Sequence, residues 1–421
     1  MVQLLRHLEP VRGVGGGPRI INAFSGIIDV AAADGMARDL ASILPPTVRA
    51  PFTATFIRSA GLCDEFVHRL GVGIFRESGL AAAVAASPGT VDELIGRAGL
   101  EPRRARAPVD WMLRRLCDRG ILERTGDPPR FRLPAAVPEL DPAPLREEQE
   151  RYDPSWRPTY VVAETVAKDY PAFLRGERNG EEILFSPARL RLWVDFFSNA
   201  NGLYVVNNLV GAGAVEEWHP PAPLSILELG GGLGSGAVAL LENLKNTGRW
   251  GEIGEYRFTE LVPAFLRRGQ NTLQTRFPDA SFLKFGALDM NQAFEKQGVT
   301  PGSASVVYAV NTLHVARDLD FTLREIFAAL APGGRLVVSE CIHTSPEQAV
   351  YVEFVFLLME TFRSPVLHPT HRPNGGFLTP GQWQGAMEAA GFVDVGVLPD
   401  IAGLRARYPD FIVAAIGATR P

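Results

Sequence analysis

Apolar positions in the second half of the chain fall into short runs separated by stretches with helical spacing. Residues 226–229 form one such run, and apolar residues recur at helical spacing from 237 to 244. Short apolar runs predict six further strands, at 256–258, 281–286, 305–310, 335–339, 392–398 and 411–417. Strands that alternate with helices are typical of an α/β fold with a mostly parallel sheet.

Helical patterns predominate in the first part of the chain. Residues 65–77 carry apolar positions on one helical face, Thr90 and Glu93 form a predicted capping box, and 103–119 is a further predicted helix. Two short strands joined by a turn follow at 120–133, so the order of elements is that of a winged helix. Weaker helical patterns precede this region, at 20–28 and 36–44.

A glycine-rich loop follows the first predicted strand of the α/β region. Glu228 comes two residues before the first of three alternating glycines, which are Gly230, Gly232 and Gly234. Glycines allow a sharp turn and a close approach of the backbone to a ligand, and the free N–H groups at the start of the next helix would face that ligand. A dinucleotide-binding fold is the alternative, because its fingerprint Gly-x-Gly-x-x-Gly/Ala fits from Gly232 but fails from Gly230.

Polar residues stand at or just after the ends of the next four predicted strands. Glu260, Asp289, His314 and Glu340 follow one another in this order, and Asn311 precedes His314. The carboxyl ends of parallel strands meet at one edge of an open α/β sheet, where such sheets bind ligands. Histidine titrates near neutral pH, and a carboxylate can orient an imidazole through its other nitrogen. We therefore predict that His314 is a catalytic base and that Glu340 orients it.

These motifs resemble those of class I S-adenosylmethionine-dependent methyltransferases. The resemblance implies a seven-stranded Rossmann-like sheet, mostly parallel with the last strand antiparallel, and S-adenosylmethionine as the cofactor. In that family an acid after the second strand binds the ribose hydroxyl groups, and an acid after the third strand lies against the adenine, where apolar neighbours pack on the ring. The cofactor-binding residues that it implies are Glu228, Gly230, Gly232, Gly234, Glu260, Leu261, Leu288, Asp289, Met290 and Asn311.

Residues 311–316 and the Pro-Gly-Gly at 332–334 resemble a more specific family, the C-methyltransferase domains of polyketide synthases. The similarity covers roughly residues 165–345. It implies that a His–Glu pair removes a proton from the α-carbon of a β-ketoacyl chain carried by an acyl carrier protein. The Gly-Trp-Trp signature of those domains is missing, and residues 359–362 occupy its place.

The chain is also similar to small-molecule O-methyltransferases, which use a catalytic histidine at this place and a winged helix for dimerisation. The Asp-Trp that usually follows their histidine is absent here. We expect a winged-helix-like dimerisation domain at 1–140, a linker and helical cover at 141–210, and a cofactor-binding methyltransferase domain at 211–421. The expected activity is C-methylation of a small-molecule or carrier-bound acyl substrate by a homodimer, and O-methylation of a hydroxyl or carboxyl group is the alternative.

Composition narrows the classes of function. The chain has 421 residues, 46% of them hydrophobic and 21% charged, with a net charge of −5. This net charge argues against a nucleic-acid partner, although arginines on the predicted helix 103–119 leave a DNA-binding cofactor sensor as an alternative. The three cysteines are far apart, and neither a signal peptide nor a bilayer-length apolar run is visible, which predicts a cytoplasmic enzyme without a membrane partner.

A metal site is a further alternative to the proton-transfer chemistry. His343, His368 and His371, together with Glu340, carry suitable ligand atoms. His368 and His371 lie in a proline-rich stretch without helical spacing, so the sequence does not fix their geometry. We therefore predict a site without a metal.

Overall fold

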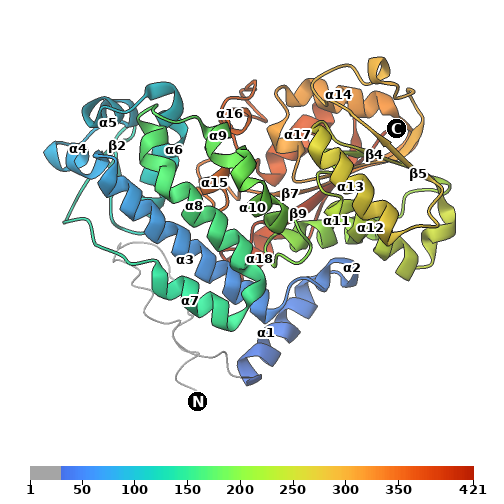
Figure 1. Ribbon diagram of the computed structural model, residues 1–421, viewed down its shortest axis with the longest axis horizontal. Coiled ribbons are helices and arrows are strands. Elements are labelled where there is room, and N and C mark those ends of the chain that lie inside the picture. The colour runs from blue at the N-terminus through green and yellow to red at the C-terminus, as the bar shows by residue number, and fades with distance from the viewer. Residues whose placement is uncertain (1–29) are drawn as a thin grey trace.

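The computed structural model describes residues 30–421, so the helix predicted at 20–28 lies outside the described residues. Its core is a seven-stranded sheet in the order β5-β4-β3-β6-β7-β9-β8 (Figure 1). The strands are β3 (Leu224–Leu229), β4 (Ile253–Thr259), β5 (Leu283–Gly286), β6 (Ala304–Val310), β7 (Leu330–Cys341), β8 (Val393–Leu398) and β9 (Val413–Thr419). β9 runs antiparallel to both of its neighbours, which confirms the predicted α/β fold with an antiparallel last strand.

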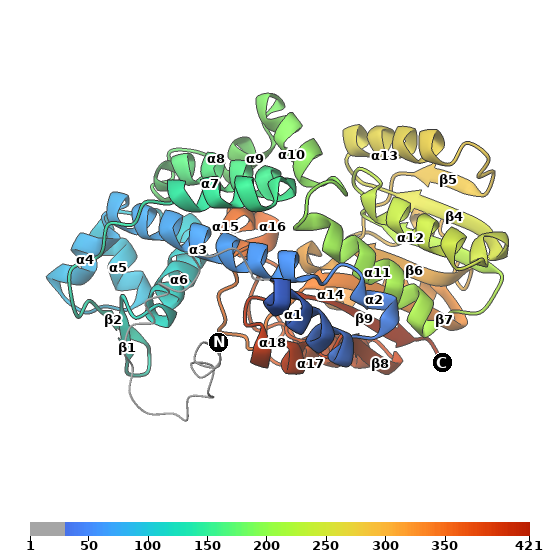
Figure 2. The same cartoon turned by 90° about the horizontal axis from the view of Figure 1, so that it is seen from below.

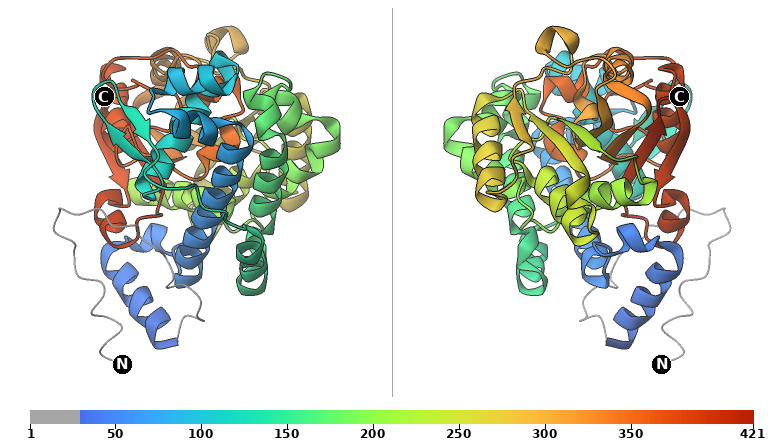
Figure 3. Two further views of the ribbon diagram at one scale, coloured as in Figure 1. Left: turned by 90° about the vertical axis from the view of Figure 1, so that its left-hand side faces the viewer. Right: turned by 90° about the vertical axis from the view of Figure 1, so that its right-hand side faces the viewer.

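Helices cover both faces of this sheet (Figure 3). One face carries α11 (Tyr204–Trp218), α12 (Ser235–Asn246) and α13 (Pro263–Arg276). The other carries α14 (Leu319–Ala329) and α17 (Pro380–Ala389). The central strands β3 and β6 are apolar along nearly their whole length because both of their faces are buried.

The N-terminal region is helical, as the sequence predicts. Thr90 and Glu93 make the capping box at the start of α5. The helices are α1 (Val30–Ile43), α2 (Pro46–Arg49), α3 (Ala54–Glu77), α4 (Leu80–Ala86), α5 (Val91–Ala98) and α6 (Pro102–Asp118), and α6 leads into the antiparallel pair β1 (Glu123–Thr125) and β2 (Arg130–Arg132). The helices α3, α5 and α6 and the hairpin follow one another in the predicted order, and α4 is an additional helix between α3 and α5.

A second group of helices packs alongside α3 of this region (Figure 2). It consists of α7 (Ala143–Tyr152), α8 (Arg157–Leu174), α9 (Gly180–Phe185) and α10 (Leu190–Phe196), and α10 extends from the group toward the sheet. Residues 190–208 belong to two helices, because α10 ends at Phe196 and α11 starts at Tyr204 and continues to Trp218.

Helix α6 ties the N-terminal region to the loop that follows β7. The Trp111 indole N–H donates to the carbonyl of Val350 over 3.0 Å, and the Arg115 guanidinium donates to the carbonyl of Ala349 over 3.2 Å. Arg115 also pairs with buried Asp64 at 2.8 Å. Since Arg115 is bound inside the protein, and Arg104 donates to the carbonyls of residues 176 and 178, the arginine-rich face of α6 is partly occupied by the chain itself.

The apolar segment 348–362 does not form one continuous helix. It contains two short helices, α15 (Glu353–Phe356) and α16 (Glu360–Arg363), and a further short helix α18 (Ile401–Arg407) follows β8. Met359 interrupts the helical path because its backbone is extended. None of the helices within residues 30–421 is long and apolar enough to cross a membrane.

Candidate active site

The glycine-rich loop joins β3 to α12 with a backbone conformation that favours glycine. Gly230, Gly232 and Gly234 have φ values of +60°, +58° and +87°, in the left-handed region that favours glycine. A Cβ atom on Gly230 would overlap the Thr312 side chain, whereas a Cβ on Gly232 would meet no described atom within 4 Å. The loop is therefore packed at its base and open at Gly232, the position where we predict contact with the cofactor.

Glu260 follows β4 and holds the glycine-rich loop. Its Oε2 accepts a hydrogen bond from the Gly232 N–H at 2.9 Å, and its Oε1 accepts one from the Val262 N–H at 2.7 Å. Burial raises the pKa of this carboxyl group, while the backbone donors oppose the rise. A carboxylate at this place has lone pairs left to accept hydrogen bonds from sugar hydroxyl groups.

Glu228 lies behind the loop. Its side chain is buried, and its Oε2 accepts a hydrogen bond from the Tyr256 hydroxyl group at 3.0 Å. Burial raises the pKa of Glu228 to about 8, so the carboxyl group is largely protonated at neutral pH. Its side chain is thus bound to β4 through Tyr256, and its contact with a cofactor stays a prediction.

The other predicted cofactor residues lie after β4, β5 and β6. Leu288 is buried, Met290 is half-buried, and Leu261 is 53% exposed. The Asp289 carboxylate accepts a hydrogen bond from the backbone N–H of residue 291 at 2.9 Å. Asn311 has a φ of +49° directly after β6, where its N–H donates to the carbonyl of residue 339. Their contacts with a cofactor stay predictions.

The predicted catalytic pair comes together at the ends of two neighbouring strands. His314 lies in the short 3₁₀ helix η6 (Leu313–Val315) just after β6, and Glu340 lies near the end of β7. The His314 Nδ1 and Glu340 Oε2 atoms are 2.6 Å apart, and both side chains are buried. The backbone N–H groups of residues 312, 313 and 314 donate to the Glu340 Oε1 at 3.1, 2.9 and 3.3 Å.

This arrangement determines which nitrogen of the His314 imidazole can act as the base. Glu340 Oε1 is occupied by the three backbone donors, so Oε2 is left to accept a hydrogen bond from the His314 Nδ1–H. The His314 Nε2 then carries the lone pair and can accept a proton. The ring of His314 packs against Phe377 and Phe362, with centroids 4.8 and 5.6 Å away.

Three of the residues around this pair could not be found from the sequence. Phe362, Arg372 and Phe377 all come from the segment after β7, and Arg372 reaches the backbone of His314 across 58 positions in the chain. No local motif marks them, because their places depend on how two distant loops fold against each other.

The candidate metal ligands are not brought together as a set. His343 faces Glu353, with 3.0 Å between its Nε2 and the Glu353 Oε1. Within residues 30–421 the structure groups His368 and His371 with Asp320 instead, without Glu340. The two imidazoles of that group are stacked in parallel at 3.7 Å, so their in-plane lone pairs do not converge on one point.

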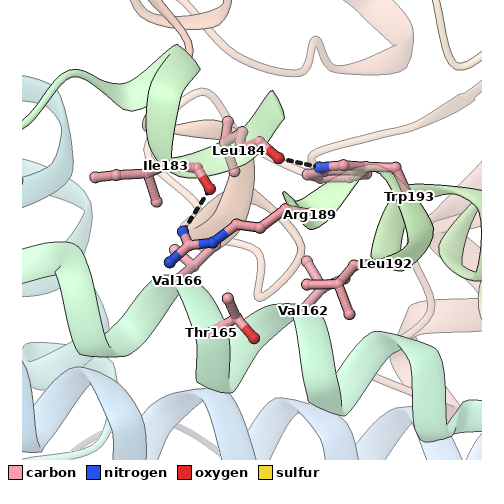
Figure 4. Close-up of a pocket in the computed structure, with 8 residues that line it drawn as sticks. All are labelled: Val162, Thr165, Val166, Ile183, Leu184, Arg189, Leu192 and Trp193. Carbon is pink, nitrogen blue, oxygen red and sulfur yellow. Dashed lines mark hydrogen bonds between the residues drawn. The ribbon is translucent and has the colours of Figure 1, made fainter. Parts of the chain in front are cut away.

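The segment that follows α10 contacts the first residue of α12, directly after the glycine-rich loop. The Ser235 hydroxyl group donates to the carbonyl of Phe197 at 2.6 Å, and the Asn199 amide donates to the carbonyl of Ser235 at 2.9 Å. Figure 4 shows an apolar pocket in the group of helices α7–α10, where Trp193 and Arg189 bond to the backbone of α9. None of the predicted catalytic or cofactor residues lines this pocket.

Comparisons with known proteins agree with the fold and with the glycine-rich loop. Residues 227–336 match the family described as "Methyltransferase domain". The polyketide synthase ThaQ of Burkholderia thailandensis is 29% identical over 403 residues, which cover 87% of this chain and 18% of that protein. Highly reducing polyketide synthase 2 of Gibberella zeae is 32% identical over 194 residues, which cover 44% of this chain and 7% of that protein. The chain thus spans only a small part of these relatives.

Solved structures share the whole architecture. The CurJ carbon methyltransferase superimposes with a TM-score of 0.69 and 22% identity, covering 92% of this chain and 98% of CurJ. The DszA carbon methyltransferase gives a TM-score of 0.67 and 23% identity, covering 91% and 95%. The trans-methyltransferase CalH, solved in complex with SAH, gives 0.57 and 20% identity, covering 85% and 90%. At these identities the similarity concerns the fold.

Proposed function

We propose that this chain, a methyltransferase of the class I fold, uses S-adenosylmethionine to methylate the activated α-carbon of a β-ketoacyl-type substrate. The observation that carries the proposal is the buried His314–Glu340 pair, whose facing atoms are 2.6 Å apart. A carbon nucleophile must lose a proton before it can accept a methyl group, and this pair is a general base with its orienting carboxylate. The similarity to polyketide synthases supports an acyl substrate.

The residues at the loop fit the cofactor. Gly232 presents open backbone to it, and Glu260 holds that backbone while keeping acceptor capacity for the ribose hydroxyl groups. Asp289 and its apolar neighbours would lie against the adenine, as the family resemblance implies. When bound, S-adenosylmethionine supplies a methyl group on a positively charged sulfur, which makes the methyl carbon an electrophile.

The residues of the chain perform the proton transfer. His314 Nε2 takes the proton from the α-carbon, and the electron pair left behind is delocalised onto the neighbouring carbonyl oxygens. The imidazolium formed on His314 is stabilised by the Glu340 carboxylate, which has no other side-chain partner within residues 30–421. Phe362 and Phe377 keep water away from the imidazole, which preserves the carbanion for methyl transfer.

The helical parts have proposed roles of a different kind. Residues 1–140 would serve as a winged-helix-like dimerisation domain, and 141–210 as a linker and cover, with the cofactor and substrate held by 211–421. The contacts of residues 197 and 199 with Ser235 support the role of the cover. The substrate would be a free small molecule or an acyl chain on a carrier protein.

An acceptor panel tests the reaction. The chain is incubated with trideuteromethyl-labelled cofactor and a β-ketoacyl thioester, and the same is done with its 2,2-dimethyl analogue, which has no α-proton. The proposal predicts one labelled methyl group on the first thioester and none on the second. Equal labelling of both thioesters would place the methyl group away from the α-carbon and would contradict the proposal.

A further inference from the structure

A buried arginine holds the backbone of the proposed catalytic base. The Arg372 side chain is 1% exposed, and its Nη2 donates to the carbonyl oxygen of His314 at 2.6 Å. Its Nε and Nη1 have no hydrogen-bond partner among the described residues. A buried cation with one hydrogen bond is costly, so a structural need alone does not explain why an arginine stands here.

Negative charges around Arg372 offset part of that cost. Glu340 of β7 and Asp318 and Asp320 at the start of α14 all stabilise the guanidinium, whereas burial lowers its pKa to about 10. Arg372 is therefore a cation at neutral pH. It thus brings a positive charge into the same buried region as the Glu340 carboxylate, on which the proton transfer depends.

The turn that carries Arg372 is fastened to the catalytic segment at several points. His368 and Arg372 exchange two backbone hydrogen bonds, of 2.9 and 3.1 Å, which close the turn. The His371 Nε2 lies 2.7 Å from the Asp320 Oδ1 on α14. The Val366 N–H donates to the carbonyl of residue 317 at 2.6 Å. Segment 366–372 is thus bound along residues 314–320, directly after the base.

We propose that Arg372 is a positioning residue that fixes the backbone of His314, so that the imidazole meets Glu340, and that balances the charge of the Glu340 carboxylate. The inference deepens the proposed function and rests on it. Its first effect is geometric, because the hydrogen bond to the carbonyl of His314 holds η6 against the turn 366–372. Its second effect is electrostatic, because its positive charge lies in the same buried region as the Glu340 carboxylate that orients the imidazole.

A purely structural arginine would behave differently. Replacing such an arginine would lower the stability of the protein. The rate of proton abstraction would then change only in proportion to the fraction of protein that is folded, and its dependence on pH would stay the same. Arg249 offers a matched control, because it is also buried and its Nη2 donates to the carbonyl of Pro220 at 2.8 Å. One of its guanidinium nitrogens likewise has no described partner, and it lies before β4, away from His314.

The experiment measures exchange of the α-proton of a β-ketoacyl thioester with D₂O, in the presence of the demethylated cofactor, which cannot donate a methyl group. Arg372→Met is expected to lower the exchange rate and kcat about 10–100-fold, as small displacements of a catalytic group do. Arg372→Lys should recover part of that loss, and Arg249→Met should stay within about threefold of the unaltered protein. Cofactor affinity should be unchanged in all three.

The pH profile gives a second readout. With the positive charge removed, the dependence of kcat on pH should change in Arg372→Met and stay in place in Arg249→Met. The groups that face Arg372 are His314, Glu340, Asp318 and Asp320, with His371 on its own turn.

Three outcomes separate the possible failures. Absence of exchange in the unaltered protein would overturn the proposed base and this inference with it. Exchange in Arg372→Met equal to that in Arg249→Met, with an unmoved pH profile, would overturn the inference and leave the base intact. If Arg372→Met does not fold, Asp320→Asn is the second variant, because it weakens the contact of His371 with α14 while Arg372 remains. It should slow the exchange by a smaller factor than Arg372→Met would. An unchanged exchange rate in Asp320→Asn would also refute the inference.

Discussion

Replacing Glu340 by glutamine changes a single atom at the centre of the proposed chemistry. In the structure the Oε1 atom accepts three backbone N–H groups and the Oε2 atom faces the His314 Nδ1 at 2.6 Å. A glutamine must place its carbonyl oxygen where Oε1 is, because its NH₂ group cannot sit opposite three donors. The NH₂ group then faces Nδ1 and donates to it.

The substitution therefore reverses the tautomer of the imidazole. With Nδ1 acting as an acceptor, the proton of neutral His314 moves to Nε2, and the base is no longer available to the substrate. The matching Asp→Asn change in serine proteases lowers kcat about 10⁴-fold. We expect kcat to fall by about 10³–10⁴, which corresponds to about 4–5.5 kcal/mol of transition-state stabilisation.

Label transfer to a β-ketoacyl thioester and calorimetric titration of the cofactor together test this expectation. Cofactor affinity should change less than threefold, because Glu340 makes no hydrogen bond to the glycine-rich loop among the described residues. Glu353→Gln is a matched control, since Glu353 is also buried and faces a histidine, His343, at 3.0 Å. If Glu340→Gln keeps more than a tenth of the turnover of Glu353→Gln, the assignment of the base and its orienting carboxylate is wrong.

Three further predictions concern the cofactor loop and its support. Gly232→Val forces a β-branched residue to a φ of +58°, so the cofactor Kd measured by calorimetry should rise at least about tenfold. Gly248→Val is the control, because Gly248 has a φ of +80° in a turn remote from the loop, and it should leave the cofactor Kd unchanged. Glu260→Gln removes the negative charge of the side chain that would accept hydrogen bonds from the ribose hydroxyl groups. Such a hydrogen bond contributes about 1–2 kcal/mol, so a rise of less than twofold in the cofactor Kd would argue against that role. Glu228 keeps its proton in the folded state up to about pH 8, while its usual pKa is 4.5. The unfolded chain binds fewer protons between these values, so stability should fall as pH rises from 4.5 to 8, by up to roughly 5 kcal/mol. Urea unfolding across this range should show a smaller fall in Glu228→Gln, and identical pH slopes would refute the buried-acid interpretation.

Much of the fold follows from local pattern. The run at 226–229 predicts β3 because the strand is buried on both faces, and the run at 305–310 predicts β6 for the same reason. The strand ends then predict which polar residues approach one another. His314 follows β6 and Glu340 lies near the end of the neighbouring strand β7, and their contact confirms that part of the reasoning.

Features that depend on distant contacts could not be predicted. The segment 348–362 is apolar enough for one helix, but α6 binds its start through Trp111 and Arg115, and the chain bends at Met359. The contact of Arg372 could not be predicted either, because nothing near it in the sequence indicates that its guanidinium reaches His314. Such contacts arise from packing between elements and leave no periodic signal in the sequence.

The position of the transferred methyl group tests the central claim most directly. With ¹³C-methyl-labelled S-adenosylmethionine and a β-ketoacyl thioester, we predict an NMR signal for a methyl group bonded to the α-carbon, and no such signal from His314→Ala. A methoxy signal, or labelling that survives His314→Ala, would contradict the assignment of this site to carbon methylation.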